Sequence, residues 1–191
     1  AWHIGRHEPD YMHLEANEVL PQLFDRLGIA KPVLVGHSDG ATIALLHAIR
    51  HPVAACIAMA PHVFVEAVAL NAIDQARQLF EAAPDAADGL RQRLARHHRD
   101  VDNAFWQWND VWLSEAFRSF DIRQDLHAIA APLLLVQGVE DEYGSMAQLE
   151  AIRREVPHAL SLELASCGHS PHRDQPDRLL AEVSGFLANV D

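Results

Sequence analysis

The sequence predicts an α/β fold, in which a mostly parallel sheet carries helices on both faces. Two observations predict it. Short apolar runs bounded by proline or glycine alternate with segments of helical periodicity, and such alternation forms right-handed βαβ units. The composition is also globular, because 49% of the 191 residues are hydrophobic and 22% are charged.

The first expected element is an amphipathic helix over residues 11–27. Apolar side chains from Leu14 to Leu27 recur at near-helical spacing, and Gly28 follows as a typical helix stop. Pro21 lies inside this pattern and predicts that the helix is kinked or restarted there.

Two strands and one helix follow. Residues 32–36 and 54–60 are short apolar runs of the kind found in buried parallel strands. Between them, residues 41–50 have the pattern of a mostly apolar helix, which ends at His51-Pro52. The chain therefore runs strand, sharp turn, helix, strand.

Residues 62–130 have a different character, with helical segments rich in Ala, Arg and Gln that predict three or four helices. The alternation then resumes after Pro132. Its expected elements are strand 133–136, helix 145–156, strand 160–164 and helix 176–190.

Charge and cysteine content exclude several classes of protein. The chain carries 27 acidic and 15 basic side chains, which disfavours a nucleic-acid partner. No apolar run reaches the about 20 residues that span a bilayer, and no leader pattern opens the chain. Cys56 and Cys167 form neither a disulfide framework nor a metal-type motif. We expect a cytoplasmic protein without a membrane partner.

The motif Gly36-His37-Ser38-Asp39-Gly40 lies between the first predicted strand and helix and matches G-x-S-x-G in its required context. A serine there occupies a tight turn that exposes its hydroxyl, and the two glycines permit the close backbone approach. The helix places N–H groups beside this serine. We predict Ser38 as a nucleophile and the Asp39 N–H as an oxyanion donor.

A serine nucleophile needs a histidine base and a carboxylate that orients it. Asp141 follows the third predicted strand and His169 follows the fourth. Glu140 and Glu142 are the alternatives for the acid, and His172 is the nearest alternative for the base.

These motifs together resemble the α/β-hydrolase fold superfamily of Ser-His-acid enzymes. The resemblance rests on the elbow at Ser38, on Gly138-x-x-Asp141, and on Gly168-His169 followed by Gln175-Pro176 and a last helix. The order Ser, Asp, His is that of the family. The spacing from Gly138 favours Asp141 as the acid.

The resemblance has consequences for domain organisation. It implies a partial α/β-hydrolase core formed by residues 1–61 and 131–191, with residues 62–130 as a helical cap. Family members normally have several strands before the elbow, and a loop after an early strand gives the second oxyanion donor. We therefore expect an N-terminally incomplete core, with that donor upstream of Ala1.

The function implied is that of a serine hydrolase that acts on a small ester, a thioester or an activated C–C bond through an acyl-enzyme. No cofactor is expected, and no metal, because the paired histidines at 97–98 and at 169 and 172 lack a ligand set. A cofactor-free perhydrolase uses the same triad and stays open. A non-catalytic ligand-binding relative or an inactive fragment is the alternative from another class.

Five further residues are candidates for substrate binding. Three of them, Trp106, Trp108 and Trp112, either pack the cap helices or turn one or two rings toward an apolar or aromatic acyl group. His37 in the elbow and His62 after the second strand are the other two. The expected partner is a small-molecule substrate, and homo-oligomer formation stays open.

Overall fold

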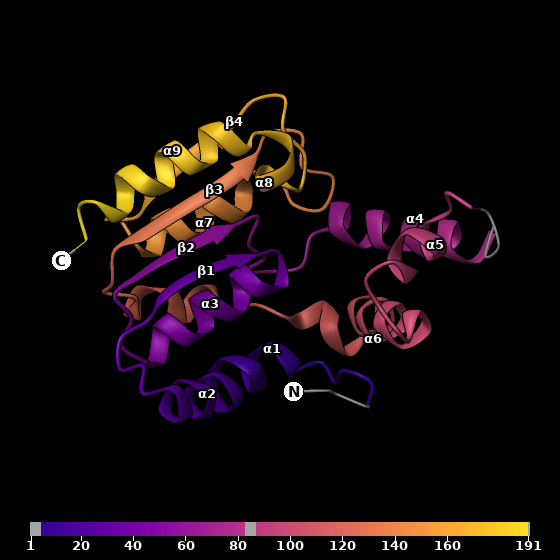
Figure 1. Cartoon of the computed structure of the whole chain (residues 1–191), viewed down its shortest axis with the longest axis horizontal. Coiled ribbons are helices and arrows are strands. Elements are labelled where there is room, and N and C mark those ends of the chain that lie inside the picture. The colour runs from indigo at the N-terminus through magenta and orange to yellow at the C-terminus, as the bar shows by residue number, and fades with distance from the viewer. Residues whose placement is uncertain (1–4, 83–86, 191) are drawn as a thin grey trace. The chain divides into compact units, whose positions relative to one another are not determined.

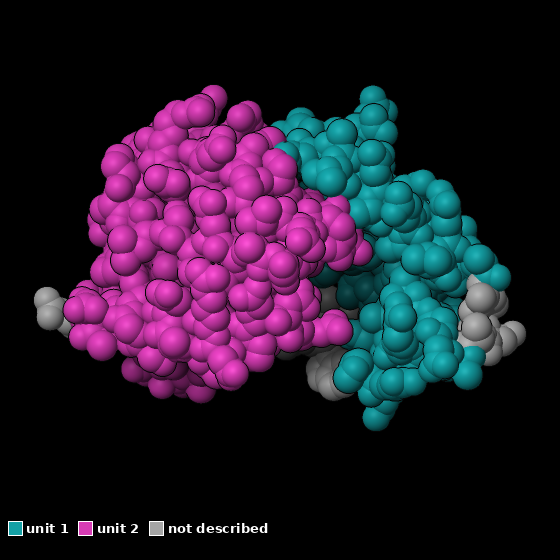
Figure 2. Space-filling model, turned by 90° about the horizontal axis from the view of Figure 1, so that it is seen from above, with its two compact units in different colours: residues 1–11, 65–120 teal, residues 12–64, 121–191 magenta. Residues whose placement is uncertain are grey.

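A computed structural model describes residues 5–82 and 87–190 (Figure 1). The chain forms two compact units (Figure 2). Unit 1 comprises Ala1–Tyr11 and Val65–Phe120, and unit 2 comprises Met12–Phe64 and Asp121–Asp191.

Unit 2 contains a four-stranded sheet in the order β1-β2-β3-β4, and all three pairings are parallel. This confirms the predicted α/β class. The strands begin and end within two residues of the expected positions, and they are β1 (Val33–His37), β2 (Ala55–Met59), β3 (Leu133–Gly138) and β4 (Leu160–Leu164). Because neighbouring strands are parallel, their carboxyl ends meet at one edge of the sheet.

Helices lie on both sides of this sheet (Figure 1). Leu179 and Phe186 of α9 (Pro176–Leu187) pack in one apolar cluster with alternate residues of β2, β3 and β4. On the other side lie α3 (Asp39–Arg50), which packs against β1 and β2, and α7 (Ala147–Glu155). The one-turn helix α8 (Pro171–Asp174) was not expected from the sequence.

The expected helix over residues 11–27 consists of three segments. A five-residue π-helical segment, Glu15–Val19, joins α1 (Tyr11–Leu14) to α2 (Leu20–Leu27). Pro21 lies at the start of α2. Since proline has no N–H to donate, the wider turn before it accommodates the missing helical hydrogen bond.

A buried histidine fastens this helix to the sheet unit. His47 of α3 is 2% exposed, and its Nδ1 lies 2.7 Å from the Ala16 carbonyl oxygen. The carbonyl can only accept, so the ring donates through Nδ1–H. Its face stacks on His51 at a centroid distance of 4.5 Å.

We expect acid to destabilise unit 2 through His47. Burial, and secondarily His51, lower the pKa of His47. The unfolded ring, with a pKa of about 6.5, therefore binds a proton at a pH where the native ring does not. The stability that the neutral ring contributes is complete above the unfolded pKa of about 6.5, and it is lost as the pH falls through the lower pKa of the native ring. His47→Asn keeps a donor for Ala16 but does not titrate.

The measurement is the melting temperature of the wild-type chain and of His47→Asn between pH 8 and pH 5. We expect a smaller decrease toward acid in the variant, even if it starts lower because ring contacts are lost. His98→Asn, at an exposed histidine, is the matched control and should follow the wild type. Equal pH slopes in all three proteins would contradict the role of His47.

Unit 1 is helical and has its own aromatic core. Its α-helices are α4 (Ala67–Ala82), α5 (Leu90–Ala95) and α6 (Val101–Leu113), and a 3-10 turn follows at Ala116–Ser119. Phe80 of α4 stacks on Phe105 of α6 at a centroid distance of 3.9 Å. The Asn109 side chain donates to the Ile73 carbonyl at 3.0 Å, which joins the same two helices.

The chain passes between the two units at residues 64–65 and 120–121, and the division into core and cap at residues 62 and 130 stays a prediction. Phe64 pairs with Asp121 in an antiparallel bridge, and the Ile122 N–H donates to the Val63 carbonyl at 2.9 Å. Residues 62–64 and 121–130, including the 3-10 helix Arg123–Ala128, therefore belong to unit 2. None of the helices among the described residues has both the length and the hydropathy needed to cross a membrane.

Candidate active site

The turn at Ser38 joins β1 to α3 in a strained backbone conformation. Ser38 has φ 56° and ψ −124°, a region that residues with a Cβ rarely occupy. A Cβ at Gly36 would lie 2.2 Å from the Gly40 carbonyl oxygen, so only glycine fits at position 36. The Ser38 N–H donates to the Met59 carbonyl of β2 at 2.9 Å. The turn is therefore fixed to the neighbouring strand.

The amino end of α3 begins directly after this serine. Asp39 is the first residue of the helix, and the N–H groups of Ala41 and Thr42 donate to the Ser38 carbonyl at 2.9 and 3.1 Å. The backbone N–H of Asp39 lies in the first turn, where the helix dipole favours negative charge. Its role as an oxyanion donor stays a prediction.

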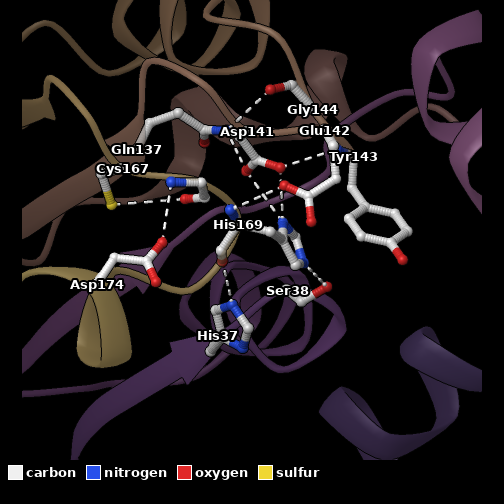
Figure 3. A network of polar contacts seen from close by, with 11 residues as sticks. His37, Ser38, Gln137, Asp141, Glu142, Tyr143, Gly144, Cys167, His169 and Asp174 are labelled. Carbon is white, nitrogen blue, oxygen red and sulfur yellow. Dashed lines mark hydrogen bonds and ion pairs between the residues drawn. The ribbon is translucent and has the colours of Figure 1, made fainter. Parts of the chain in front are cut away.

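Ser38, Asp141 and His169 come together at the carboxyl edge of the sheet (Figure 3). His169 Nε2 lies 2.9 Å from Ser38 Oγ, and His169 Nδ1 lies 2.9 and 3.0 Å from the two carboxylate oxygens of Asp141. A carboxylate accepts, so Nδ1 carries the proton and the Nε2 lone pair faces the hydroxyl. This tautomer can take a proton from the serine.

The alternatives for the acid and the base occupy other places. Glu140 is exposed. Glu142 accepts a hydrogen bond from the backbone N–H of His169 at 3.2 Å, not from the imidazole. The exposed ring of His172 lies edge-on to His37, at a centroid distance of 4.8 Å.

Asp141 is held in a buried position by neutral donors. Its side chain is 0% exposed. The Gln137 side chain donates to Oδ2 at 2.6 Å, and the backbone N–H of Tyr143 donates to Oδ1 at 2.8 Å. Sequence reasoning missed both contacts, although a lone polar residue in the apolar run of β3 was a visible signal for Gln137.

The backbone around His169 is fastened on several sides (Figure 3). Asp174 Oδ2 accepts from the Gly168 N–H at 2.9 Å. His37 Nε2 lies 2.6 Å from the His169 carbonyl oxygen. Burial is the main cause that lowers the pKa of His37, so the ring is neutral at pH 7 and donates this bond. The substrate-binding role of His37 stays a prediction.

His62 lies close to the three residues. It is 3% exposed, and its ring centroid is 5.9 Å from that of His169. The backbone N–H of His62 donates to Thr42 Oγ1 at 3.0 Å, and that hydroxyl donates back to the His62 carbonyl at 2.9 Å. A role for His62 in binding substrate stays a prediction.

The three tryptophans of α6 pack within unit 1. Trp112 is 1% exposed, and its indole N–H donates to the Tyr11 hydroxyl at 3.2 Å. Trp106 and Trp108 are partly buried and lie edge-on to Phe105, at centroid distances of 5.1 and 5.9 Å. These contacts agree with the alternative in which the three tryptophans pack the helices against one another. The proposed contact of these rings with an acyl group is still a prediction.

Gly138 permits close contact between the turn that bears Asp141 and the loop that bears His169. A Cβ at this position would lie 2.2 Å from the carbonyl oxygens of Cys167 and Gly168. We expect Gly138→Ala to lower the free energy of unfolding by about 3 kcal/mol, because the backbone has to shift. Activity should fall as well, since Asp141 and His169 lie on the displaced segments.

Thermal melting and ester turnover measure this effect. The matched control is Gly185→Ala in α9, where a Cβ meets no atom within 4 Å. That variant should be as stable as the wild type or slightly more so, because alanine favours the helix. If Gly138→Ala melted and turned over like the wild type, the two segments would be able to move apart without loss of stability or activity, and the prediction would be wrong.

Within residues 5–82 and 87–190, no group of three or more His, Cys, Asp or Glu side chains has an arrangement that could hold a metal ion. The exposed pair His97 and His98 therefore has no further ligand of these types among those residues.

Known proteins resemble this chain over half of its length or more. The mouse sn-1-specific diacylglycerol lipase is 26% identical over 206 aligned positions, which cover 95% of this chain and 67% of the mouse protein. An esterase of Mycobacterium tuberculosis is 29% identical over 103 positions, which cover 51% of this chain and 33% of the esterase. The chain thus spans two thirds of one relative and one third of the other.

A solved structure shows the same fold. It is that of an alpha/beta hydrolase from a Medee basin deep-sea metagenome library, with a TM-score of 0.69 and 20% identity. The similarity covers 91% of this chain and 71% of that one. The sequence profile described as the alpha/beta hydrolase family matches residues 2–183. The parallel sheet and this match lead to one conclusion: the chain belongs to the alpha/beta hydrolase family.

Proposed function

We propose that the protein is a serine hydrolase that cleaves small carboxylic esters through an acyl-enzyme. The observation that carries the proposal is the continuous contact from Ser38 Oγ through both nitrogens of His169 to the buried carboxylate of Asp141. A serine hydroxyl is a weak nucleophile, and an oriented neutral imidazole is the group that activates it.

The geometry supports a specific order of steps. Ser38 Oγ attacks the ester carbonyl carbon while its proton moves to His169 Nε2, which forms a tetrahedral oxyanion. The Asp39 N–H stabilises that oxyanion. His169 then gives the proton to the leaving alkoxide as the C–O bond breaks, and the acyl group stays on Ser38. A water repeats the sequence, so the products are an alcohol, a carboxylic acid and free enzyme.

Asp141 does not itself take up the proton in these steps. Its contact with Nδ1 keeps the productive tautomer of the imidazole, and its charge offsets the imidazolium that forms when His169 accepts the proton. The carboxylate is buried, so this attraction is screened less by solvent than that of a surface pair.

Esters are favoured over thioesters and activated C–C bonds because the mouse relative is named a diacylglycerol lipase and the mycobacterial relative an esterase. A serine nucleophile forms an acyl ester with any of these substrates, so the elbow itself does not select among them. We propose an apolar or aromatic acyl group, on the basis of the aromatic residues of unit 1.

The test combines turnover with covalent labelling. The purified chain is incubated with p-nitrophenyl acetate, p-nitrophenyl butyrate and a fluorophosphonate probe, and the labelled peptide is identified by mass spectrometry. We expect hydrolysis of both esters and modification at Ser38. A folded chain that neither labels nor hydrolyses would exclude the proposal and favour a ligand-binding relative without catalysis.

A further inference from the structure

Gln137 is a polar side chain in the interior of an apolar strand. It lies in β3 next to Gly138 and is 0% exposed, as are its strand neighbours Leu135 and Val136. Burial of an amide in such surroundings is unfavourable unless the amide forms hydrogen bonds. The partners of this amide therefore indicate why it is there.

The surroundings of Gln137 determine which way its amide points. Nε2 faces two oxygen atoms, Asp141 Oδ2 at 2.6 Å and the Gly144 carbonyl at 3.0 Å. Only the NH₂ end can donate to both, which fixes the orientation of the amide. Oε1 is buried and has no hydrogen-bond partner among the described residues. The amide thus leaves its acceptor unpaired while it provides two donors.

Within the described part of the chain, two side chains donate to the Asp141 carboxylate, those of His169 and Gln137 (Figure 3). The remaining donor, the Tyr143 N–H, belongs to the same turn as Asp141 and moves with it. The Gln137 amide comes from the rigid strand and also holds the far end of the turn at Gly144.

We propose that Gln137 is a positioning residue that fixes the Asp141 carboxylate, and through it the imidazole of His169, in the geometry that activates Ser38. This inference rests on the proposed serine-hydrolase function. The hydrogen bonds of Gln137 run to Asp141 and Gly144 and not to Ser38 or the His169 ring, so it acts by supplying a donor from β3 that does not titrate.

Two variants separate this role from a structural one. Gln137→Met keeps the length of the side chain and removes both donors together with the unpaired acceptor. The change leaves Asp141 Oδ2 and the Gly144 carbonyl with one donor fewer, so we expect a lower melting temperature, and the kinetics are measured at a temperature where the variant is still folded. We expect kcat for p-nitrophenyl butyrate to fall about tenfold to a hundredfold, with KM within about twofold, because only the orientation of the base is lost.

Gln137→Glu replaces the donor by a carboxyl group beside Asp141. Because two negative charges this close repel each other, the pair holds one proton at low pH and loses it only at a higher pH than a lone carboxyl group would. The protonated Glu donates its O–H to Asp141 and restores the contact. As the pH rises, that proton is lost to water and two negative charges face each other.

Other titratable groups lie near this pair, namely His169, Glu142, Tyr143 and His62. The wild-type enzyme contains all of them, so the ratio of kcat between variant and wild type cancels their common effects. Burial raises the pKa of Tyr143 above its usual value, which keeps the phenol neutral over the range used.

The experiment measures kcat, KM and the rate of fluorophosphonate labelling from pH 6 to pH 9. We expect the ratio of kcat of Gln137→Glu to kcat of the wild type to decrease by about tenfold or more from pH 6 to pH 9. A tenfold decrease corresponds to about 1.4 kcal/mol. The ratio for Gln137→Met should be low and constant. Gln148→Met is the matched control.

Gln148 is also 0% exposed, and its amide bonds to the backbone of Val63 and Phe64 rather than to Asp141. Its variant should keep the wild-type pH profile even if it melts earlier. If wild type and Gln137→Met label and turn over equally, Gln137 does not position the acid. If the wild-type chain itself does not label at Ser38, the proposed function fails and the positioning role fails with it.

Discussion

Ser38→Ala is expected to lower kcat for p-nitrophenyl butyrate by about 10⁶-fold, the scale found when a triad serine is removed from other enzymes. The change deletes only the Oγ atom that lies 2.9 Å from His169 Nε2. No acyl-enzyme can then form. The residual rate would come from binding and from backbone donors alone.

Stability should be almost unaffected by this substitution. Alanine and serine both carry a Cβ, so the strain at φ 56° is the same in each. Steady-state turnover, labelling and thermal melting are measured together, with Ser184→Ala at an exposed position of α9 as the matched control. Turnover by Ser38→Ala within tenfold of the wild type would rule out Ser38 as the nucleophile.

Asp141→Asn is expected to lower kcat by about 10⁴-fold. The amide NH₂ can donate to Nδ1 of His169, which moves the imidazole proton to Nε2. That nitrogen then faces Ser38 Oγ with a proton instead of a lone pair and cannot act as a base. The loss should appear in kcat and in the labelling rate, with KM little changed.

Neighbouring acids provide the controls for this prediction. Glu140→Gln removes an exposed charge next to Asp141 and should keep kcat within about twofold of the wild type. Glu142→Gln keeps an oxygen that can accept from the His169 N–H, and we expect only a small loss. If one of these variants lost activity and Asp141→Asn did not, the acid would have been assigned to the wrong carboxylate.

The sequence predicts the sheet well because β1, β2 and β3 are short apolar runs close to proline or glycine, whereas β4 alternates, with Leu162 and Leu164 buried and Ser161 and Glu163 exposed. The turn at Ser38 is predictable because it depends on neighbours in the sequence. Position 36 requires glycine because of its contact with Gly40, which is only four positions further along the chain. The π-helical segment before Pro21 was not predicted, because a five-residue change of helical pitch leaves little trace in an apolar pattern.

Two hydrogen bonds of the site were not predicted. One joins residues that are far apart in the sequence, and the other starts from a residue inside a strand. The bond from His37 to the His169 carbonyl joins residues 132 positions apart, and no local pattern encodes it. Gln137 and Asp141 are only four residues apart, but strand periodicity does not show that the chain turns back between them. The limits of unit 1 likewise depend on the bridge between Phe64 and Asp121.

The hydrogen bond from the Ser38 amide to Met59 links the proposed nucleophile to the folding of the whole sheet. A strained turn persists only where its surroundings hold it, and here β2 supplies the holding contact. Amide hydrogen exchange at Ser38 should therefore be as slow as in the central strands, since both require the same opening event. In a denaturant titration, loss of catalysis would then coincide with unfolding of unit 2, so activity would serve as a direct reporter of sheet integrity.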